Sequence, residues 1–156
     1  MLKKFVISMT AALVVLTGCS GGSKGDETKE LSIKDTAAKL VSELSLSDTV
    51  SEIQERTMYG YFFDMDKETV TEGSVYLNSD GKSDTVGVFR TTDVEKCKNY
   101  LNTYIETIKK QSEVYSPEEV FKISHALVQD YGKDIVVILI CNDIEAARTT
   151  ADKILK

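Results

Sequence analysis

The sequence is poor in the residues that build catalytic centres and metal sites. Its 156 residues include one histidine, His125, three cysteines and no tryptophan. A metal site usually needs several ligands, and a histidine that acts as a general base usually needs a partner that orients it. There is no phosphate-binding glycine loop, and no nucleophile elbow surrounds Ser124 or Cys97. The sequence therefore indicates no catalytic residue, no cofactor and no metal.

Long hydrophobic runs are also missing. Residues 5–16 are largely apolar and follow Lys3 and Lys4, which is the layout of a secretory signal. A spanning helix needs about 20 apolar residues, so this run is too short to be a transmembrane anchor. It ends in Leu16-Thr17-Gly18-Cys19, which resembles the bacterial lipobox, where a lipid is attached to the cysteine and the preceding peptide bond is cut. The alternative is an ordinary secretory signal in which Cys19 has no special role.

These features divide the chain into three predicted segments. Residues 1–18 form a lipoprotein signal peptide, residues 19–31 form the lipidated Cys19 with a flexible tether, and residues 32–156 form a single domain. Residues 20–30 contain no apolar side chain, so they cannot bury surface and are expected to be disordered. The predicted mature chain has the size of one domain plus a tether.

Basic residues are too few to balance the acidic ones. The chain has 19 Lys and Arg against 25 Asp and Glu; Lys3 and Lys4 leave with the signal peptide, so the mature balance is 17 against 25, or −8. Nucleic acid and anionic lipid both repel such a chain. We therefore expect no nucleic-acid partner and a membrane attachment that depends on the lipid on Cys19. The expected location is the extracytoplasmic face of the cell membrane, with an unidentified protein of the cell envelope as a candidate partner.

The first part of the domain contains one clear helix. Ser32 is suited to the N-cap, and apolar residues at helical spacing predict a helix that ends near residue 46. Residues 47–57 give a mixed signal of weak helix or loop. Residues 58–63 carry aromatic side chains around Gly60. An exposed run of this kind would be a binding patch, but we expect a loop folded onto the core.

Residues 64–68 alternate carboxylates in the manner of a calcium loop. The helix-loop-helix calcium loop needs glycine at position six and glutamate at position twelve. Thr69 and Val75 occupy those positions here. The match fails, and we expect a solvated turn or the start of a helix.

The second half contains a repeat. Residues 75–105 and 125–155 align without a gap at an offset of 50 residues. Each unit has the pattern of a strand, a glycine-containing turn, a second strand and a helix with one apolar face. Two such ββα units and the N-terminal helix predict an α+β fold with two layers, in which a four-stranded antiparallel sheet carries helices on one face.

Residues 135–141 form an unbroken apolar run within the second unit. A strand of this composition is expected to be central and covered on both faces. The second face of the sheet would then be covered by the first helix and the aromatic segment, or by another subunit.

Two cysteines lie within the predicted domain. Cys97 and Cys141 could pair, because the compartment outside the membrane permits disulfides. The repeat places Cys97 opposite Ala147, a small core residue, and Cys141 opposite Thr91, at a strand end. We therefore expect two buried, inert thiols.

Taken together, these motifs resemble a family of bacterial lipoproteins that carry the domain of unknown function 4358. The likeness covers about residues 33–155, and Tyr115-Ser116-Pro117-Glu118-Glu119 is its most specific part. Other stretches contribute: Met58-Tyr59-Gly60, Gly73-Ser74-Val75-Tyr76-Leu77, Val88-Phe89, Ile123, Ala126-Leu127-Val128, Gly132-Lys133 and Asn142-Asp143. The resemblance implies an extracytoplasmic, lipid-anchored domain and brings no assigned activity and no catalytic residues.

The expected function is that of a non-enzymatic binding or interaction module. The alternatives are a hydrolase of envelope material, whose carboxylates only the fold brings together, and a solute-capturing lipoprotein, for which the domain is small. His125 aligns with Val75 in the repeat, which predicts a histidine on a strand face. Glu118 and Glu119 lie at a helix start, where the helix dipole and solvent account for them.

Overall fold

The computed structural model describes residues 31–47 and 49–156, which belong to one compact unit, Leu31–Lys156. The predicted signal peptide, the lipobox residues Leu16, Thr17 and Gly18, the lipidation site Cys19 and most of the predicted tether lie outside the described residues. The elements are α1 (Ile33–Glu43), β1 (Val50–Glu52), α2 (Glu55–Tyr61), β2 (Val70–Asn78), β3 (Thr85–Thr91), α3 (Val94–Tyr115), the 3₁₀ turn η1 (Pro117–Glu119), α4 (Val120–Ser124), β4 (Leu127–Tyr131), β5 (Ile135–Ile140) and α5 (Ile144–Leu155).

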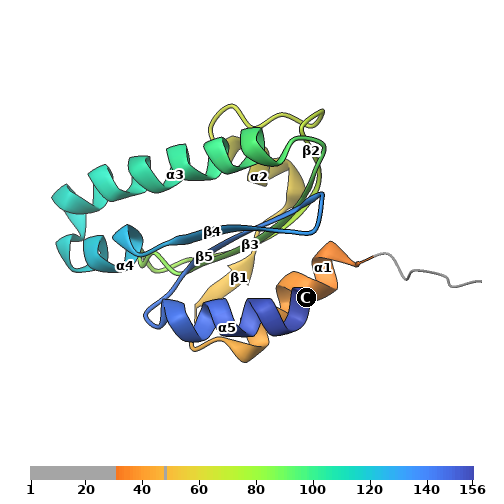
Figure 1. The fold of residues 1–156 in the computed structure, drawn as a ribbon. Coiled ribbons are helices and arrows are strands. Elements are labelled where there is room, and N and C mark those ends of the chain that lie inside the picture. Colours follow the sequence, from red (N-terminus) through yellow and green to blue (C-terminus); the bar gives the residue numbers. More distant parts are fainter. Residues whose placement is uncertain (1–30, 48) are drawn as a thin grey trace, which may run out of the picture. The chain divides into compact units, whose positions relative to one another are not determined.

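The α+β class is confirmed, but the sheet is larger than predicted. Within the described residues five strands form an antiparallel sheet in the order β1-β2-β3-β5-β4 (Figure 1). The additional strand, β1, lies in the segment of mixed signal and pairs with the outer edge of β2, Ser51 opposite Leu77. A strand of three residues is too short to show an alternating pattern, so this segment carries no strand signal in the sequence.

Helices cover both faces of the sheet, so the predicted two-layer arrangement is wrong. α2, α3 and α4 lie on one face, and α1 and α5 lie on the other (Figure 1). Successive residues of β5 enter the two cores in turn, with Val136 and Ile138 on the α3 face and Val137 and Leu139 on the α1 face. The apolar run therefore marks a central strand that is buried on both sides, as predicted.

The pairing of β3 with β5 shows why the repeat misled the layer prediction. Val88 lies opposite Val137 and Phe89 opposite Val136, and residues paired in this way share a face. The 50-residue offset instead matches Val88 with Ile138, which belong to different cores. Equivalent residues of the two units thus point to opposite faces, and the helices that follow, α3 and α5, pack on opposite faces too.

Both cysteines of the domain are buried free thiols. Cys97 belongs to the core on the α3 face, and Cys141 to the core on the α1 face. Burial raises the pKa of the Cys97 thiol to about 12 and also raises the pKa of Cys141. Because the thiolate is the reactive form, both side chains act as small core residues.

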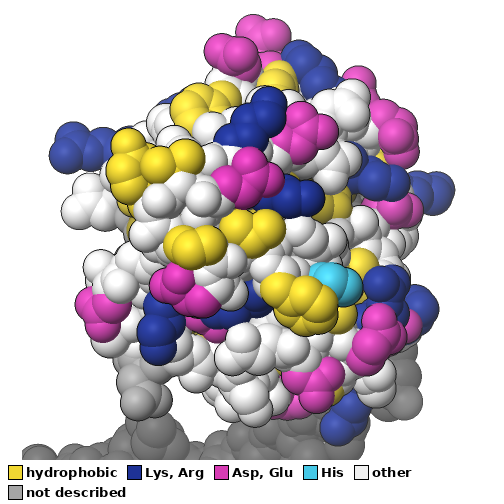
Figure 2. Space-filling model, turned by 90° about the vertical axis from the view of Figure 1, so that its left-hand side faces the viewer, with side chains coloured by type: hydrophobic (Ala, Val, Ile, Leu, Met, Phe, Trp, Pro, Cys, Tyr) yellow, Lys and Arg dark blue, Asp and Glu magenta, His cyan; other side chains and the backbone are white. Residues whose placement is uncertain are grey.

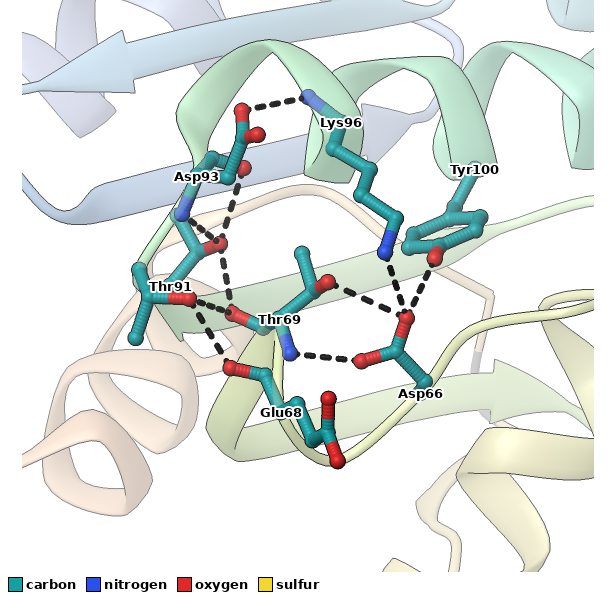
Figure 3. A network of polar contacts seen from close by, with 8 residues as sticks. Asp66, Glu68, Thr69, Thr91, Asp93, Lys96 and Tyr100 are labelled. Atoms are coloured by element: carbon teal, nitrogen blue, oxygen red, sulfur yellow. Dashed lines mark hydrogen bonds and ion pairs between the residues drawn. The ribbon is translucent and has the colours of Figure 1, made fainter.

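The acidic segment 64–68 forms turns between α2 and β2 that are braced by Asp66 (Figure 3). Its Oδ2 accepts hydrogen bonds from Lys96 Nζ at 2.8 Å and Tyr100 Oη at 2.7 Å, and its Oδ1 accepts from Thr69 N at 2.6 Å. These donors hold the pKa of Asp66 well below its ordinary value. The segment fastens the loop to α3, and the described residues contain no group of three or more His, Cys, Asp or Glu that could hold a metal ion.

Candidate functional site

An ionic cluster lies at the end of the sheet where β3 begins and β5 ends. Lys122 on α4 places its Nζ 3.0 Å from Asp84 Oδ2 and 2.8 Å from Glu119 Oε2. The backbone N–H of Ser83 donates to the same Glu119 oxygen at 2.8 Å. We call Ser83, Asp84, Glu119 and Lys122 the Asp84 cluster.

Local sequence explains how the cluster forms. Ser116 ends α3, and Pro117 opens η1 with the fixed φ that suits a first helical position. The turn places Glu119 and Lys122 three residues apart, the spacing at which side chains on a helical segment meet. Asp84 immediately precedes β3, and the position of β3 in the sheet brings this residue next to Glu119 and Lys122.

The cluster is almost closed to solvent. The exposed fractions of the Asp84, Lys122 and Glu119 side chains are 1%, 8% and 12%. Desolvation acts to raise the pKa of Glu119, but hydrogen bonds from Lys122 and Ser83 outweigh it and lower the pKa to about 2. Desolvation acts to lower the pKa of Lys122, but its hydrogen bonds with Glu119 and Asp84 raise it instead. Glu119 and Lys122 are therefore both charged at neutral pH.

One oxygen of Asp84 has no partner. Oδ2 accepts hydrogen bonds from Lys122 Nζ at 3.0 Å and from Ser47 Oγ at 3.2 Å. Oδ1 is buried, and no donor in the described part of the chain reaches it. A buried acceptor without a donor costs about 1–3 kcal/mol. Asp84 Oδ1 is therefore a buried acceptor that the described side chains leave unsatisfied.

Asp84 lines two hollows. One, of about 200 Å³, lies beside the β2–β3 turn and α3, with Leu77, Tyr104 and Ile123 among its walls. The other, of about 360 Å³, is bordered by the segment after α1 and by Glu119 and Lys122. Both hollows are lined by polar and apolar side chains, and Lys82 and Asp84 border both of them.

Exposed apolar side chains surround this end of the molecule. Val114, Tyr115 and Phe121 are 71%, 83% and 74% exposed; we call these three residues the apolar rim. Figure 2 shows hydrophobic side chains and the histidine at the surface of this side of the molecule. Large apolar side chains that gather at the surface mark interaction sites.

His125 is not on a strand face, so that prediction is wrong. It ends α4, and its exposed ring places Nδ1 2.7 Å from the carbonyl oxygen of Phe121. The two rings also lie against each other, with centroids 4.2 Å apart. β4 begins only at Leu127, which is why the alignment of His125 with the buried Val75 failed.

The aromatic segment 58–63 is mostly helical rather than a loop. Met58 and Phe62 pack into the core, as the packing interpretation predicts. Tyr61 and Phe63 are 45% and 46% exposed, and Tyr61 lines the hollow of about 200 Å³ beside Asp84. The segment therefore contributes both to the core and to the candidate site.

The sequence interpretation did not find Asp84 or Lys122. In the repeat Asp84 matches Asp134, whose side chain is 47% exposed and pairs with Arg90. Nothing in the local pattern distinguishes the buried aspartate from the exposed one. Lys122 lies on a helix of five residues, which is too short to show by periodicity which side chains are buried.

The fold and the site define a single α+β domain with a buried ionic cluster and two hollows at one end. The chain belongs to the family Domain of unknown function (DUF4358), whose family model matches residues 42–141. Neither the search of curated proteins nor the search of solved structures found a match. In the described part of the chain no helix combines the length and the apolar character needed to cross a membrane.

Proposed function

We propose that this chain is a lipid-anchored binding module without enzymatic activity, held at the extracytoplasmic face of the membrane by a lipid on Cys19. The supporting observation is that the chain enters the domain far from the Asp84 cluster. Leu31 O accepts a hydrogen bond from Arg90 Nη2 at 2.7 Å, near the last residue of β3. Asp84 directly precedes the first residue of β3, and six strand steps separate the two ends by about 20 Å. A chain anchored before Leu31 would therefore leave the Asp84 cluster and the apolar rim clear of the point at which the tether joins the domain.

The state of the carboxylates favours binding over hydrolysis. Hydrolases that use two carboxylates need one of them protonated, to act as an acid. Asp84 and Glu119 do converge, but Lys122 bridges them, and the pKa of Glu119 is lowered to about 2. Glu119 is therefore unsuited to donate a proton near neutral pH. An ion pair that shapes a binding surface accounts better for this geometry.

Proximity labelling in intact cells tests this function. The labelling enzyme is fused after Lys156, and the intact chain is compared with Cys19→Ala. We expect the intact mass of the membrane-extracted chain to show a lipid on Cys19. We also expect one envelope protein to be enriched with the intact chain and lost with Cys19→Ala. An unmodified thiol at Cys19, or the same neighbours for both chains, would contradict the proposal.

A further inference from the structure

We propose that the outer edge of β2 binds an extended segment of a partner protein, in which an apolar residue lies between two basic residues. The segment would lie beside Gly73 as an additional strand of the sheet, which is a common mode of peptide binding. This edge shares no lining residue with the two hollows that Asp84 borders. The inference therefore goes beyond the proposed function and concerns a second binding surface of the domain.

The backbone of Gly73 has no strand beside it on this edge. β2 runs over Val70–Asn78, but β1 pairs only with its residues 76–78. The hydrogen bond from Ile53 N to Val75 O, at 2.9 Å, shows that Val75 directs its carbonyl group toward the β1 side. Backbone groups alternate between the two edges of a strand, so Gly73 directs its N–H and C=O the same way. Within the described residues no donor or acceptor meets these two groups.

A hollow of about 490 Å³ lies along this edge. It is lined by residues 71–74 of β2, by residues 52–55, with which the chain leaves β1 for α2, and by Lys34 of α1. Gly73 is half-buried, and because glycine has no side chain, it is the backbone of Gly73 that lines the hollow. At about 3.4 Å per residue, the edge formed by residues 71–74 is about 10 Å long and takes about three residues of an added strand.

The charge of the hollow determines which segment fits. One cation, Lys34, lines it together with three carboxylates: Glu52, Glu55 and Glu72. The lining thus has an excess of two negative charges. Arg90 pairs with Glu72 and also with Asp134, so counting these groups leaves the excess unchanged. A second copy of this chain would place the same carboxylates against these, which is unfavourable, whereas basic residues would be attracted.

The two faces of the edge differ in character. A Cβ on Gly73 would meet the side chain of Met58, and Ile53 packs against the same core on the α3 face. Successive residues of a strand point to opposite faces, so Glu72 lies on the other face, and the pairing of β1 with β2 puts Glu52 there too. Residues directly opposite each other on paired strands share a face. The residue opposite Gly73 should therefore be apolar, and its two neighbours should be basic.

Hydrogen exchange at the Gly73 amide tests the inference. The probe is the peptide acetyl-Thr-Lys-Val-Lys-Thr-amide, added to the purified full chain, and exchange is followed by nuclear magnetic resonance. In the chain alone we expect the Gly73 amide to exchange faster than the amide of Ser74, which faces β3. With the peptide at ten times its dissociation constant, exchange at Gly73 should slow about 10-fold, because only the free chain exchanges.

Altered peptides and variants separate the backbone from the charge. N-methylation of the valine removes the N–H that would donate to Gly73 O and should abolish the slowing. Acetyl-Thr-Glu-Val-Glu-Thr-amide keeps the backbone but brings carboxylates toward Glu72 and Glu52, and should not bind. Glu72→Gln should weaken binding of the lysine peptide about 2- to 5-fold, as expected for the loss of an exposed ion pair. Glu106→Gln, which alters an exposed glutamate of α3, should leave binding unchanged.

Equal slowing by the N-methylated or the glutamate peptide would overturn the inference, as would the absence of slowing with the lysine peptide. A Gly73 amide that already exchanges slowly in the chain alone would overturn it too. If that slow exchange depends on chain concentration, a second copy covers the edge; if it does not, another part of this chain does. None of these results concerns the lipid on Cys19 or the Asp84 cluster, so each would leave the proposed function standing.

Discussion

Replacing Lys122 with methionine is expected to lower the free energy of unfolding by about 3–5 kcal/mol at neutral pH. The change leaves Asp84 and Glu119, whose side chains are 1% and 12% exposed, without their shared cation. Methionine keeps most of the volume of the lysine stem, so the loss reports on charge more than on packing. Urea unfolding of the unaltered chain and of Lys122→Met measures this loss of stability. The control is Lys82→Met, an exposed lysine beside the same hollows, which should change stability by no more than about 0.5 kcal/mol.

The pH dependence of the loss gives a second check. The pKa of Glu119 in the folded protein is about 2, against an ordinary value of 4.5. Its contribution to stability is therefore present above pH 4.5 and is lost as the pH falls toward 2. In Lys122→Met the two carboxylates have lost their shared cation. Protonation then removes the cost of their buried charges and raises the free energy of unfolding. The gap between the two proteins should thus narrow as the pH falls below about 5. A gap below 1 kcal/mol at pH 7, or one that widens in acid, would contradict the account of the cluster.

Phe89→Ala is expected to destabilise the domain by about 3–5 kcal/mol, because it opens a cavity in the centre of the α3-side core. Phe89 is fully buried, and its ring packs edge-on against Phe62 with centroids 5.4 Å apart. The ring also lies beside Gly87 on the same strand, where an added Cβ would come within 2.8 Å of it. The core is thus packed around the Phe89 ring, and no other side chain is placed to fill the cavity that the substitution leaves.

The matched control is Phe121→Ala, the same chemical change at a ring that is 74% exposed. We expect it to alter the free energy of unfolding by no more than about 0.5 kcal/mol. Thermal or urea unfolding of both variants measures the difference. A large loss with Phe121→Ala would mean that the apolar rim serves the fold, and the rim would then no longer support a binding role.

The strands and helices of the repeat could be predicted because their patterns are local. Both ββα units form as predicted: β2, β3 and α3, then β4, β5 and α5. The number of layers could not be predicted, since it depends on which face each helix meets. Shared caps and apolar faces are the same whether α3 and α5 lie together or apart. The strand register decides on which face of the sheet each helix packs, because Val88 lies opposite Val137 rather than opposite its repeat counterpart Ile138.

The candidate site could not be predicted because its parts lie far apart in the sequence. Asp84 and Lys122 are 38 residues apart, and their bond depends on the sheet and on the turn after α3. The exposure of Phe121 is likewise a property of the fold, since an aromatic residue among Val120, Lys122 and Ile123 gives no sign of facing solvent. What the sequence did predict here was local: the helix start at Glu118 and Glu119, which lie in η1.

Site-specific photo-crosslinking tests the central claim, that the end of the domain with the Asp84 cluster and the apolar rim is a binding surface. A photo-reactive phenylalanine analogue replaces Phe121 in the full chain, and a second chain carries it at Lys153, an exposed position on α5. Irradiation of intact cells should give one discrete crosslinked product from position 121 and none of that size from position 153. Equal products from both positions, or none from position 121 in a correctly anchored chain, would contradict the claim.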